Sequence, residues 1–210
     1  MNIVLITGVK GNLGRAVATE FTHRGWNVVG LDRDDVDCSN ADEVQSWVNS
    51  QDLSTLAAVV HTIGGIRAGR AVHEAPLDDA NVMMNLNYFT TLHVARAVLP
   101  RLRTNAGAFV AVGAQATLNV TQAKGYYAAS KAALNALVLT IAEEGRHDGL
   151  RANVVVPSIL RTPENLEWAE GGEEESWVTP EQVAYVIAAL CDTNNRTSGA
   201  IIPVLGGVAR

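Results

Sequence analysis

Short apolar runs rich in β-branched residues alternate along this chain with longer stretches of helical periodicity. The runs are nearly continuous in hydrophobicity, which is typical of strands in a parallel sheet covered on both faces. They predict strands at residues 3–6, 27–31, 57–61, 108–112, 152–156 and 200–204. The helical pattern predicts helices at residues 13–24, 41–49, 87–102, 127–144 and 180–191. This alternation predicts an α/β fold, a doubly wound parallel sheet with helices on both faces, in a single domain over residues 1–210.

One segment breaks the alternation. Residues 163–177 carry a run of glutamates around Gly171 and Gly172 and contain two of the four tryptophans. The pattern predicts a mobile loop or a lid over a binding site, for which Trp168 or Trp177 would supply an apolar wall. A solvated surface loop fits the same composition equally well.

Composition narrows the classes of partner. The 210 residues are 48% hydrophobic and 18% charged, with a net charge of −6. No basic cluster offsets this acid excess, which argues against nucleic acid or an anionic membrane surface as a partner. Cys38 and Cys191 lack metal-ligand spacing, so we interpret them as free thiols and expect no metal site. The chain enters a strand at once and has no apolar run long enough to span a membrane, so we expect a cytoplasmic location.

Three glycines stand at three-residue intervals between the first predicted strand and the first predicted helix: Gly8, Gly11 and Gly14. Glycines allow a tight turn, a close approach of backbone to phosphate, and close packing of helix on strand. The N–H groups at the helix start then point at a pyrophosphate. An ordinary turn could also contain these glycines, but the strand–turn–helix context favours a dinucleotide site on a Rossmann-type sheet.

Asp32 lies at the end of the second predicted strand. A carboxylate there accepts hydrogen bonds from the adenosine ribose of a dinucleotide and repels a 2′-phosphate, which favours NAD(H). Lys10 and Arg33 favour NADP(H) instead, because either cation could receive a 2′-phosphate. NADP(H) therefore stays possible, and Asp32 could also be a simple turn residue.

Tyr127 and Lys131 are four residues apart in a predicted helix, so both side chains leave the same face. An adjacent ammonium should lower the pKa of a phenol from its usual value of about 10. Alone, this spacing more often marks a half-buried ring beside a solvated amine. Together with the glycine motif it predicts an oxidoreductase in which Tyr127 is a proton donor.

Three motifs occur in a fixed order: Thr7-Gly-x-x-Gly-x-x-Gly14, Tyr127-x-x-x-Lys131 and Arg151-Ala-Asn-Val-Val-Val-Pro157. In this respect the chain resembles the short-chain dehydrogenase/reductase family over almost its whole length. It is most similar to the dihydropteridine reductase branch, on Gly113-Ala-Gln-Ala-Thr-Leu118 and on the segments after Val156. The resemblance implies NAD(P)H-dependent reduction of a small molecule, with quinonoid dihydropteridine as the expected substrate. It also implies a homodimer or homotetramer, as does the apolar surface of the helices at 87–102 and 127–144.

The resemblance assigns roles to individual residues. Tyr127 would donate the proton, and Lys131 would hold the nicotinamide ribose and lower the pKa of Tyr127. Asn87 would seat a proton-relay water, with Asn85 as its rival. The implied cofactor contacts are Gly8, Lys10, Gly11, Asn12, Leu13, Gly14, Asp32, Arg33, Asp37, Cys38, Gly64, Tyr127, Lys131, Pro157, Ile159 and Thr162. Among these, Asp37 and Cys38 would contact adenine.

One position departs from the family. Most members have a serine thirteen residues before the tyrosine, and here that position is Ala114. Losing such a hydrogen-bond donor typically raises a barrier by about 2.7–4 kcal/mol. Either Gln115 or Thr117 replaces it, or the substrate needs no such donor, as a quinonoid dihydropterin would not. The alternatives are a reductase or dehydrogenase for another carbonyl, alcohol or quinone, and a non-catalytic NAD(P)-binding sensor or scaffold.

Overall fold

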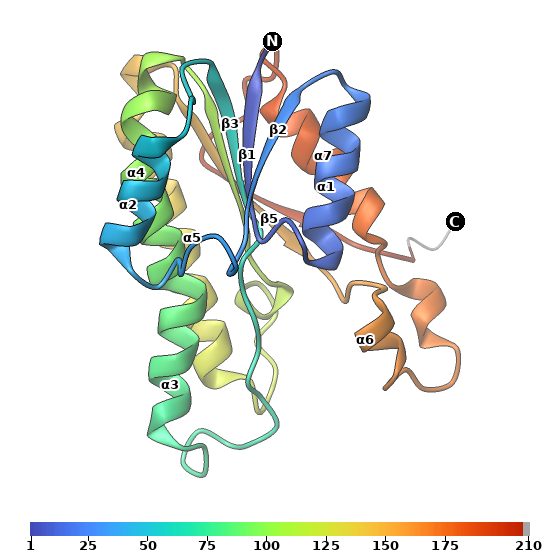
Figure 1. The fold of residues 1–210 in the computed structure, drawn as a ribbon. Helices are drawn as coiled ribbons and strands as arrows, with labels where there is room; N and C mark the ends of the chain where they lie inside the picture. Colours follow the sequence, from blue (N-terminus) through green and yellow to red (C-terminus); the bar gives the residue numbers. More distant parts are fainter. Residues whose placement is uncertain (208–210) are drawn as a thin grey trace.

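The computed structural model describes residues 1–207, and a parallel sheet runs through its centre (Figure 1). The strands are β1 (Ile3–Thr7), β2 (Asn27–Leu31), β3 (Leu56–His61), β4 (Ala108–Val112), β5 (Arg151–Pro157) and β6 (Ala200–Val204). Their order across the sheet is β2-β1-β3-β4-β5-β6, with every pair parallel. The chain direction across the sheet reverses between β1 and β3, and the carboxyl ends of the strands open a crevice at such a point.

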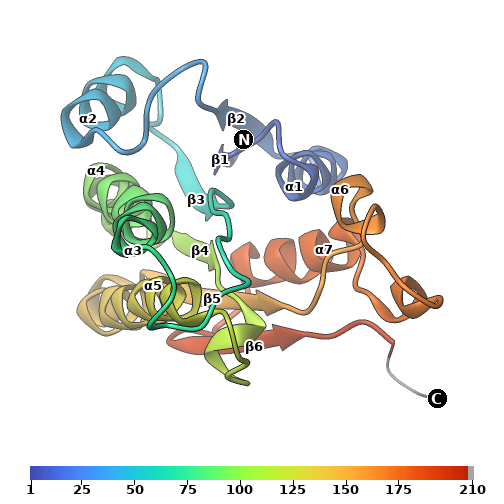
Figure 2. The same cartoon turned by 90° about the horizontal axis from the view of Figure 1, so that it is seen from below.

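Helices cover both faces of this sheet (Figure 2). One face carries α1 (Asn12–His23) and α7 (Pro180–Cys191). The other carries α2 (Ala41–Ser50), α4 (Thr90–Thr104) and α5 (Gly125–Glu144). Each interface holds its own apolar core, and every residue of β1 and β4 is buried as a result. The predicted doubly wound sheet is therefore confirmed, as are its six strands.

The helix predicted over residues 87–102 was wrong at its start. Helical structure begins with α3 (Leu77–Met83), passes through a π-helical turn (Met84–Phe89), and continues into α4. In Figure 1, α3 extends beyond the sheet, and Leu77 is 78% exposed there. With little core to face, α3 needs no apolar stripe, and the π-helical turn shifts the register of the residues behind it. Both effects remove the periodicity from which a helix is predicted.

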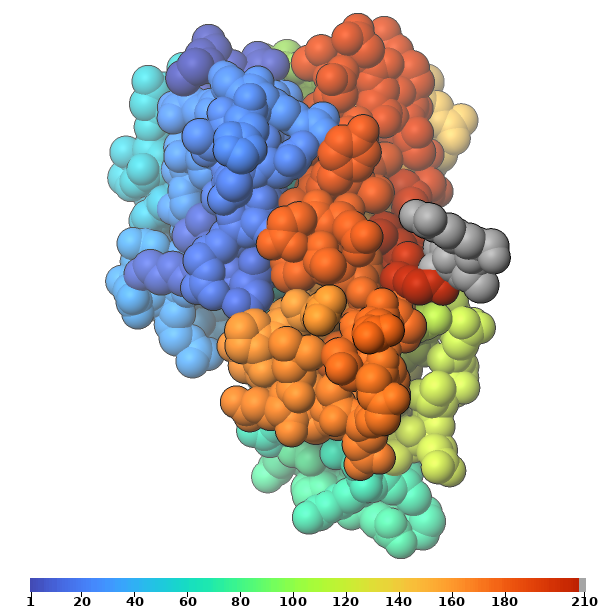
Figure 3. Space-filling model, turned by 90° about the vertical axis from the view of Figure 1, so that its right-hand side faces the viewer, coloured from blue at the N-terminus to red at the C-terminus, as the bar shows by residue number. Residues whose placement is uncertain are grey.

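Residues 163–177, hereafter the lid segment, contain the short helix α6 (Pro163–Leu166) and a 3₁₀ turn (Glu173–Ser176). A β-bridge between Leu160 and Val178 joins the two ends of the segment beside the sheet. Figure 3 shows the lid segment, in orange, on the surface between the blue α1 side and the teal segment that precedes α3. Within residues 1–207, no helix is both long and apolar enough to cross a membrane.

Candidate functional site

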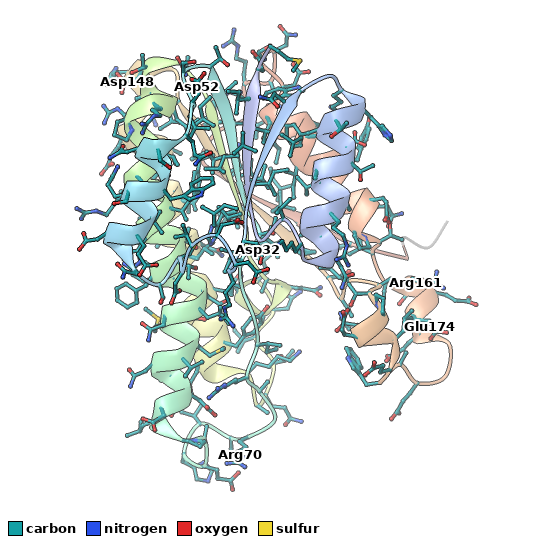
Figure 4. The ribbon with its side chains drawn as sticks, viewed as in Figure 1. Asp32, Asp52, Arg70, Asp148, Arg161 and Glu174 are labelled. Atoms are coloured by element: carbon teal, nitrogen blue, oxygen red, sulfur yellow. The ribbon has the colours of Figure 1, made fainter. Side chains whose placement is uncertain are left out.

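A cleft of about 1430 Å³ lies at the carboxyl ends of the strands, between α5 and the lid segment. In Figure 4, Asp32 lies at the lower end of the sheet, Arg161 lies just before the lid segment and Glu174 within it, and Arg70 marks the tip of the segment before α3. The predicted site residues that line the cleft are Gly8, Gly11, Asn12, Leu13, Gly14, Asp32, Arg33, Asp37, Cys38, Gly64, Tyr127, Lys131, Pro157, Ile159 and Thr162. Lys10 and Asn87 lie outside its lining.

The glycine loop has the shape of a phosphate cradle. Gly8 has a φ of +74°, and a Cβ on Gly14 would lie 2.1 Å from the carbonyl oxygen of Gly8. Helix α1 begins without a side-chain cap at Gly11 and without an acidic residue in its first turn. Its free N–H groups therefore carry partial positive charge toward the cleft, which suits the pyrophosphate of a dinucleotide. Asn12 of this turn also donates to the Glu164 carboxylate of the lid segment, with an N···O distance of 2.7 Å.

Asp32 is held in place by backbone hydrogen bonds. Its carboxylate accepts from the N–H groups of Lys10 and Arg33, each at 2.8 Å. The ammonium of Lys10 pairs instead with Asp34 at 2.7 Å, and its side chain is 58% exposed. Lys10 thus contacts Asp32 only through its backbone N–H, while Arg33 lines the cleft beside Asp32. Of the two cations that could receive a 2′-phosphate, only Arg33 lies at the cleft.

Asp37 and Cys38 form the outer end of this wall. Asp37 accepts a hydrogen bond from the N–H of Ser39 at 2.9 Å, which lowers the pKa of its carboxyl. Burial raises the pKa of the Cys38 thiol to about 12. The thiol is therefore neutral and unreactive at physiological pH, and it offers the cleft an apolar surface.

Tyr127 and Lys131 both face the cleft from the first two turns of α5. The ammonium of Lys131 donates to the carbonyl of Val112 at 2.8 Å, and burial lowers the pKa of Lys131 to about 8. Burial raises the pKa of Tyr127. The expected lowering of the Tyr127 pKa by Lys131 was wrong, because desolvation of the phenol dominates and the ammonium donates to Val112. The raised pKa keeps the phenol protonated at neutral pH, the state that a proton donor needs.

Asn87 lies in the π-helical turn and is fully buried. Its amide nitrogen donates to the Gly65 carbonyl and the Ser130 hydroxyl, each at 3.0 Å, and its oxygen accepts from the Gly65 N–H at 3.0 Å. Asn87 therefore ties the loop after β3 to α5, next to Lys131. Because both amide hydrogens are used, Asn87 has no free N–H for a water, and its rival Asn85 is the one that lines the cleft. The relay role of Asn87 stays a prediction.

Ala114 lines the cleft where most of the family has serine, and it is 5% exposed. The Thr117 hydroxyl donates to the Ala114 carbonyl at 2.8 Å and accepts from the Asn135 amide at 3.0 Å, so it is fully engaged. The Gln115 side chain makes no hydrogen bond within residues 1–207 and lines the cleft. Of the two predicted substitutes for the serine, Gln115 is the one placed to meet a substrate.

Sequence reasoning missed part of the lining. The missed residues include Thr62, Ile63, Gly65, Val112, Gly113 and Ser158. All of them follow or end β3, β4 or β5, so the rule that ligands bind at the carboxyl ends of parallel strands would have found them. Trp168 of the lid segment, which the sequence suggested as an apolar wall, lines the cleft, whereas Trp177 does not. Glu164 lines the cleft as well, and no motif marked it as a cleft residue.

His61 is fully buried at the end of β3. The Thr90 hydroxyl already donates to the Leu86 carbonyl at 2.7 Å, so His61 Nε2–H must donate to Thr90 at 3.3 Å. Nδ1 then accepts from the Thr7 hydroxyl at 2.8 Å. Burial, and then the charge of Lys131, lower the pKa of His61 to about 3. The neutral ring links β1 and β3 to α4 directly beneath the cleft.

His61 should make the protein acid-sensitive. In the unfolded chain histidine titrates near 6.5, so between pH 6.5 and 3 the unfolded state binds the extra proton. The contribution of His61 to the free energy of unfolding is therefore fully present above pH 6.5. Below that pH the free energy of unfolding falls by up to about 1.4 kcal/mol per pH unit. We expect His61→Asn to flatten this slope, measured by urea unfolding at pH 7, 6 and 5. An unchanged slope would show that other groups cause the acid sensitivity, and His73→Asn, on an exposed residue, is the control.

Comparison with known proteins agrees with this geometry. A family model described as enoyl-(acyl carrier protein) reductase matches residues 35–209. Dihydropteridine reductase of Dictyostelium discoideum is 27% identical over 86% of this chain and 84% of its own length. Meso-2,3-butanediol dehydrogenase of Serratia marcescens is 25% identical over 98% of this chain and 93% of its own.

Solved structures share the fold. ElxO with NADP bound superposes with a TM-score of 0.87 at 20% identity and covers 97% of this chain and 96% of its own. NAD⁺-bound xylitol dehydrogenase gives a TM-score of 0.87 at 21% identity and covers 98% of each chain. The chain belongs to the short-chain dehydrogenase/reductase family and is an NAD(P)-dependent oxidoreductase.

Proposed function

We propose that this oxidoreductase transfers hydride from NADH to a conjugated electrophile, with quinonoid dihydropteridine as the substrate. The observation that carries the proposal is Ala114, an apolar residue in the cleft wall where most of the family has a serine hydroxyl. A quinonoid ring needs little polarisation, because accepting hydride restores its conjugation. The likeness to the dihydropteridine reductase of Dictyostelium discoideum supports the same substrate.

In this reaction the bound nicotinamide supplies the hydride, and the residues of the chain orient the reactants and move the proton. Tyr127 donates its hydroxyl proton to the substrate as the hydride arrives, so that one hydride and one proton are added in total. Lys131 would hold the nicotinamide ribose, and its ammonium would then give up the hydrogen bond to the Val112 carbonyl. The positive charge of Lys131, close to the phenolate that forms, favours release of the Tyr127 proton.

We further propose that NAD(H) is the preferred cofactor, because the Asp32 carboxylate lines the cleft and Lys10 is turned toward Asp34. Replacing Asp32 by alanine should raise the Kd for NADH by about 10- to 150-fold, the equivalent of a hydrogen bond to a charged group worth about 1.5–3 kcal/mol. The same change should leave or improve NADPH binding, which calorimetric titration with both cofactors measures. Equal weakening of both would contradict the proposed role, and Lys10→Ala should change neither greatly.

A second candidate is the reduction of a simple carbonyl, or oxidation of the matching alcohol. It is favoured by the Gln115 side chain, an unengaged donor in the cleft, and by the likeness to meso-2,3-butanediol dehydrogenase. In this case Gln115 would hydrogen-bond the substrate oxygen as serine does in most of the family.

Gln115→Leu separates the two candidates. For a quinonoid substrate we expect kcat/KM to change by about threefold or less, since no oxyanion needs a donor. For a simple carbonyl the loss should be about 10²–10³-fold. The measurement is kcat/KM with a quinonoid dihydropterin and with a simple diketone, diacetyl. A large loss with the dihydropterin would contradict the first proposal. Thr117→Ser, which keeps the hydroxyl, is the control.

We also propose a homodimer or homotetramer assembled through α4 and α5. Supporting it, the outer side of α5 presents the exposed small residues Ala129, Ala132 and Ala136 at helical spacing. A flat face of this kind allows close approach of two helices.

A further inference from the structure

We propose that Trp168 of the lid segment, supported by Trp177, is a stacking wall that selects substrates with a planar conjugated ring. The inference deepens the proposed function, on which it rests: it assigns ring recognition to this pair and names flatness as the property recognised.

The two tryptophans have different environments. Trp168 is 51% exposed and lines the cleft, whereas Trp177 is 6% exposed and lies outside the lining. Their ring centroids are 4.9 Å apart at an interplanar angle of 40°. Trp177 thus backs Trp168 from the protein side and leaves Trp168 exposed to the cleft.

The support behind the pair is fixed to the sheet. Val178, the residue after Trp177, donates its N–H to the Ile159 carbonyl at 3.1 Å and accepts from the Arg161 N–H at 2.8 Å. Ile159 lies just after β5, at the carboxyl end of the sheet, and it also lines the cleft. Trp177 is therefore tied to a rigid element, so Trp168 has a firm surface on which to rest. A tryptophan on an otherwise solvated loop would have no such backing.

The walls of the cleft differ in polarity. The polar groups that move a proton, Tyr127 and Lys131, come from α5, and the lid segment forms another wall. Ala114 adds apolar surface to the cleft in place of a hydroxyl. A large exposed aromatic face backed by a second aromatic gains most from an offset-stacked flat ring, by about 0.5–1.5 kcal/mol beyond area burial. A saturated, puckered ring gains only the area.

The test measures ligand binding to the full chain saturated with NAD⁺, which has no hydride to transfer. Titration calorimetry gives the Kd of 6-methylpterin, a flat ring, and of decalone, a saturated bicyclic ketone. We expect Trp168→Leu to weaken 6-methylpterin binding roughly tenfold and Trp168→Phe to keep it within about twofold. Decalone binding, which depends only on buried area, should differ by less than about threefold among the three proteins. Tyr185→Ala, at an exposed aromatic on α7, is the control.

Three results of the binding experiments would overturn the inference. They are 6-methylpterin binding that is the same in wild type and Trp168→Leu, no binding of 6-methylpterin to the wild type, and a roughly tenfold weaker binding of NADH in Trp168→Leu. The last would mean that Trp168 covers the cofactor. Turnover of quinonoid dihydropterin is measured separately. Turnover with a KM unaffected by Trp168→Leu rejects the inference and keeps the function. If 6-methylpterin binding depends on Trp168 but quinonoid dihydropterin is not turned over, the proposed function is rejected and the stacking wall is kept.

Discussion

Replacing Tyr127 by phenylalanine is expected to lower kcat by about 10²–10⁴-fold, the usual contribution of a positioned acid. The change removes one oxygen from a side chain that lines the cleft and leaves the ring in place. The Kd for NADH should therefore stay within about twofold, since Lys131 and the glycine loop are untouched. Steady-state rates and calorimetric titration with NADH measure the two quantities on the same protein.

The neighbouring tyrosine provides a matched control. Tyr126 lies on the same turn of α5 but outside the cleft lining, and its hydroxyl makes long contacts of 3.4 Å to the carbonyls of Val72 and Ala75. We expect Tyr126→Phe to retain nearly full activity. If Tyr127→Phe also retains most of its activity, then Tyr127 is not the proton donor.

The second large effect is expected from Gly14→Ala. A Cβ at this position would lie 2.1 Å from the Gly8 carbonyl oxygen and 2.8 Å from the Val9 Cα, both backbone atoms that cannot rotate away. The loop must move, at a cost of about 1–3 kcal/mol, and the cradle loses its fit to the pyrophosphate. We expect the Kd for NADH to rise by at least about tenfold, together with a lower unfolding midpoint. Binding is measured by titration and stability by urea unfolding.

Gly11→Ala is a milder change in the same loop, against which Gly14→Ala can be compared. Its Cβ would lie 3.3 Å from the Gly8 carbonyl oxygen, a contact that a shift of a few tenths of an ångström relieves. Its cost should be clearly smaller than that of Gly14→Ala. Equal NADH affinity in Gly14→Ala and wild type would contradict the assignment of this loop as the cofactor cradle.

Local chemistry explains which parts of the molecule were predictable. The strands were found because burial on both faces requires continuous apolar runs, and β1 and β4 are buried throughout. Helix α7 was found from end to end because Thr179 caps it and Pro180 opens it. The glycine loop was found because its spacing is a steric requirement, as the contact at Gly14 shows.

The remainder depends on contacts between distant segments. The π-helical turn buries Asn87 against Gly65 and Ser130. The residues of that turn alone do not indicate which groups the Asn87 side-chain amide will bind. Lys131 sits one turn from Tyr127 as expected, yet its ammonium binds Val112, 19 residues away in sequence. Desolvation of Tyr127 likewise depends on the whole cleft, so the direction of its pKa shift could not be derived from the spacing of two residues.

The central claim is tested most directly by the rate of NADH oxidation with freshly generated quinonoid dihydropterin, against a reaction without protein and one with Tyr127→Phe. We expect rapid, saturable turnover that depends on Tyr127 and proceeds with Ala114 in the cleft wall. No rate above the protein-free reaction, in a preparation shown to bind NADH, would contradict it.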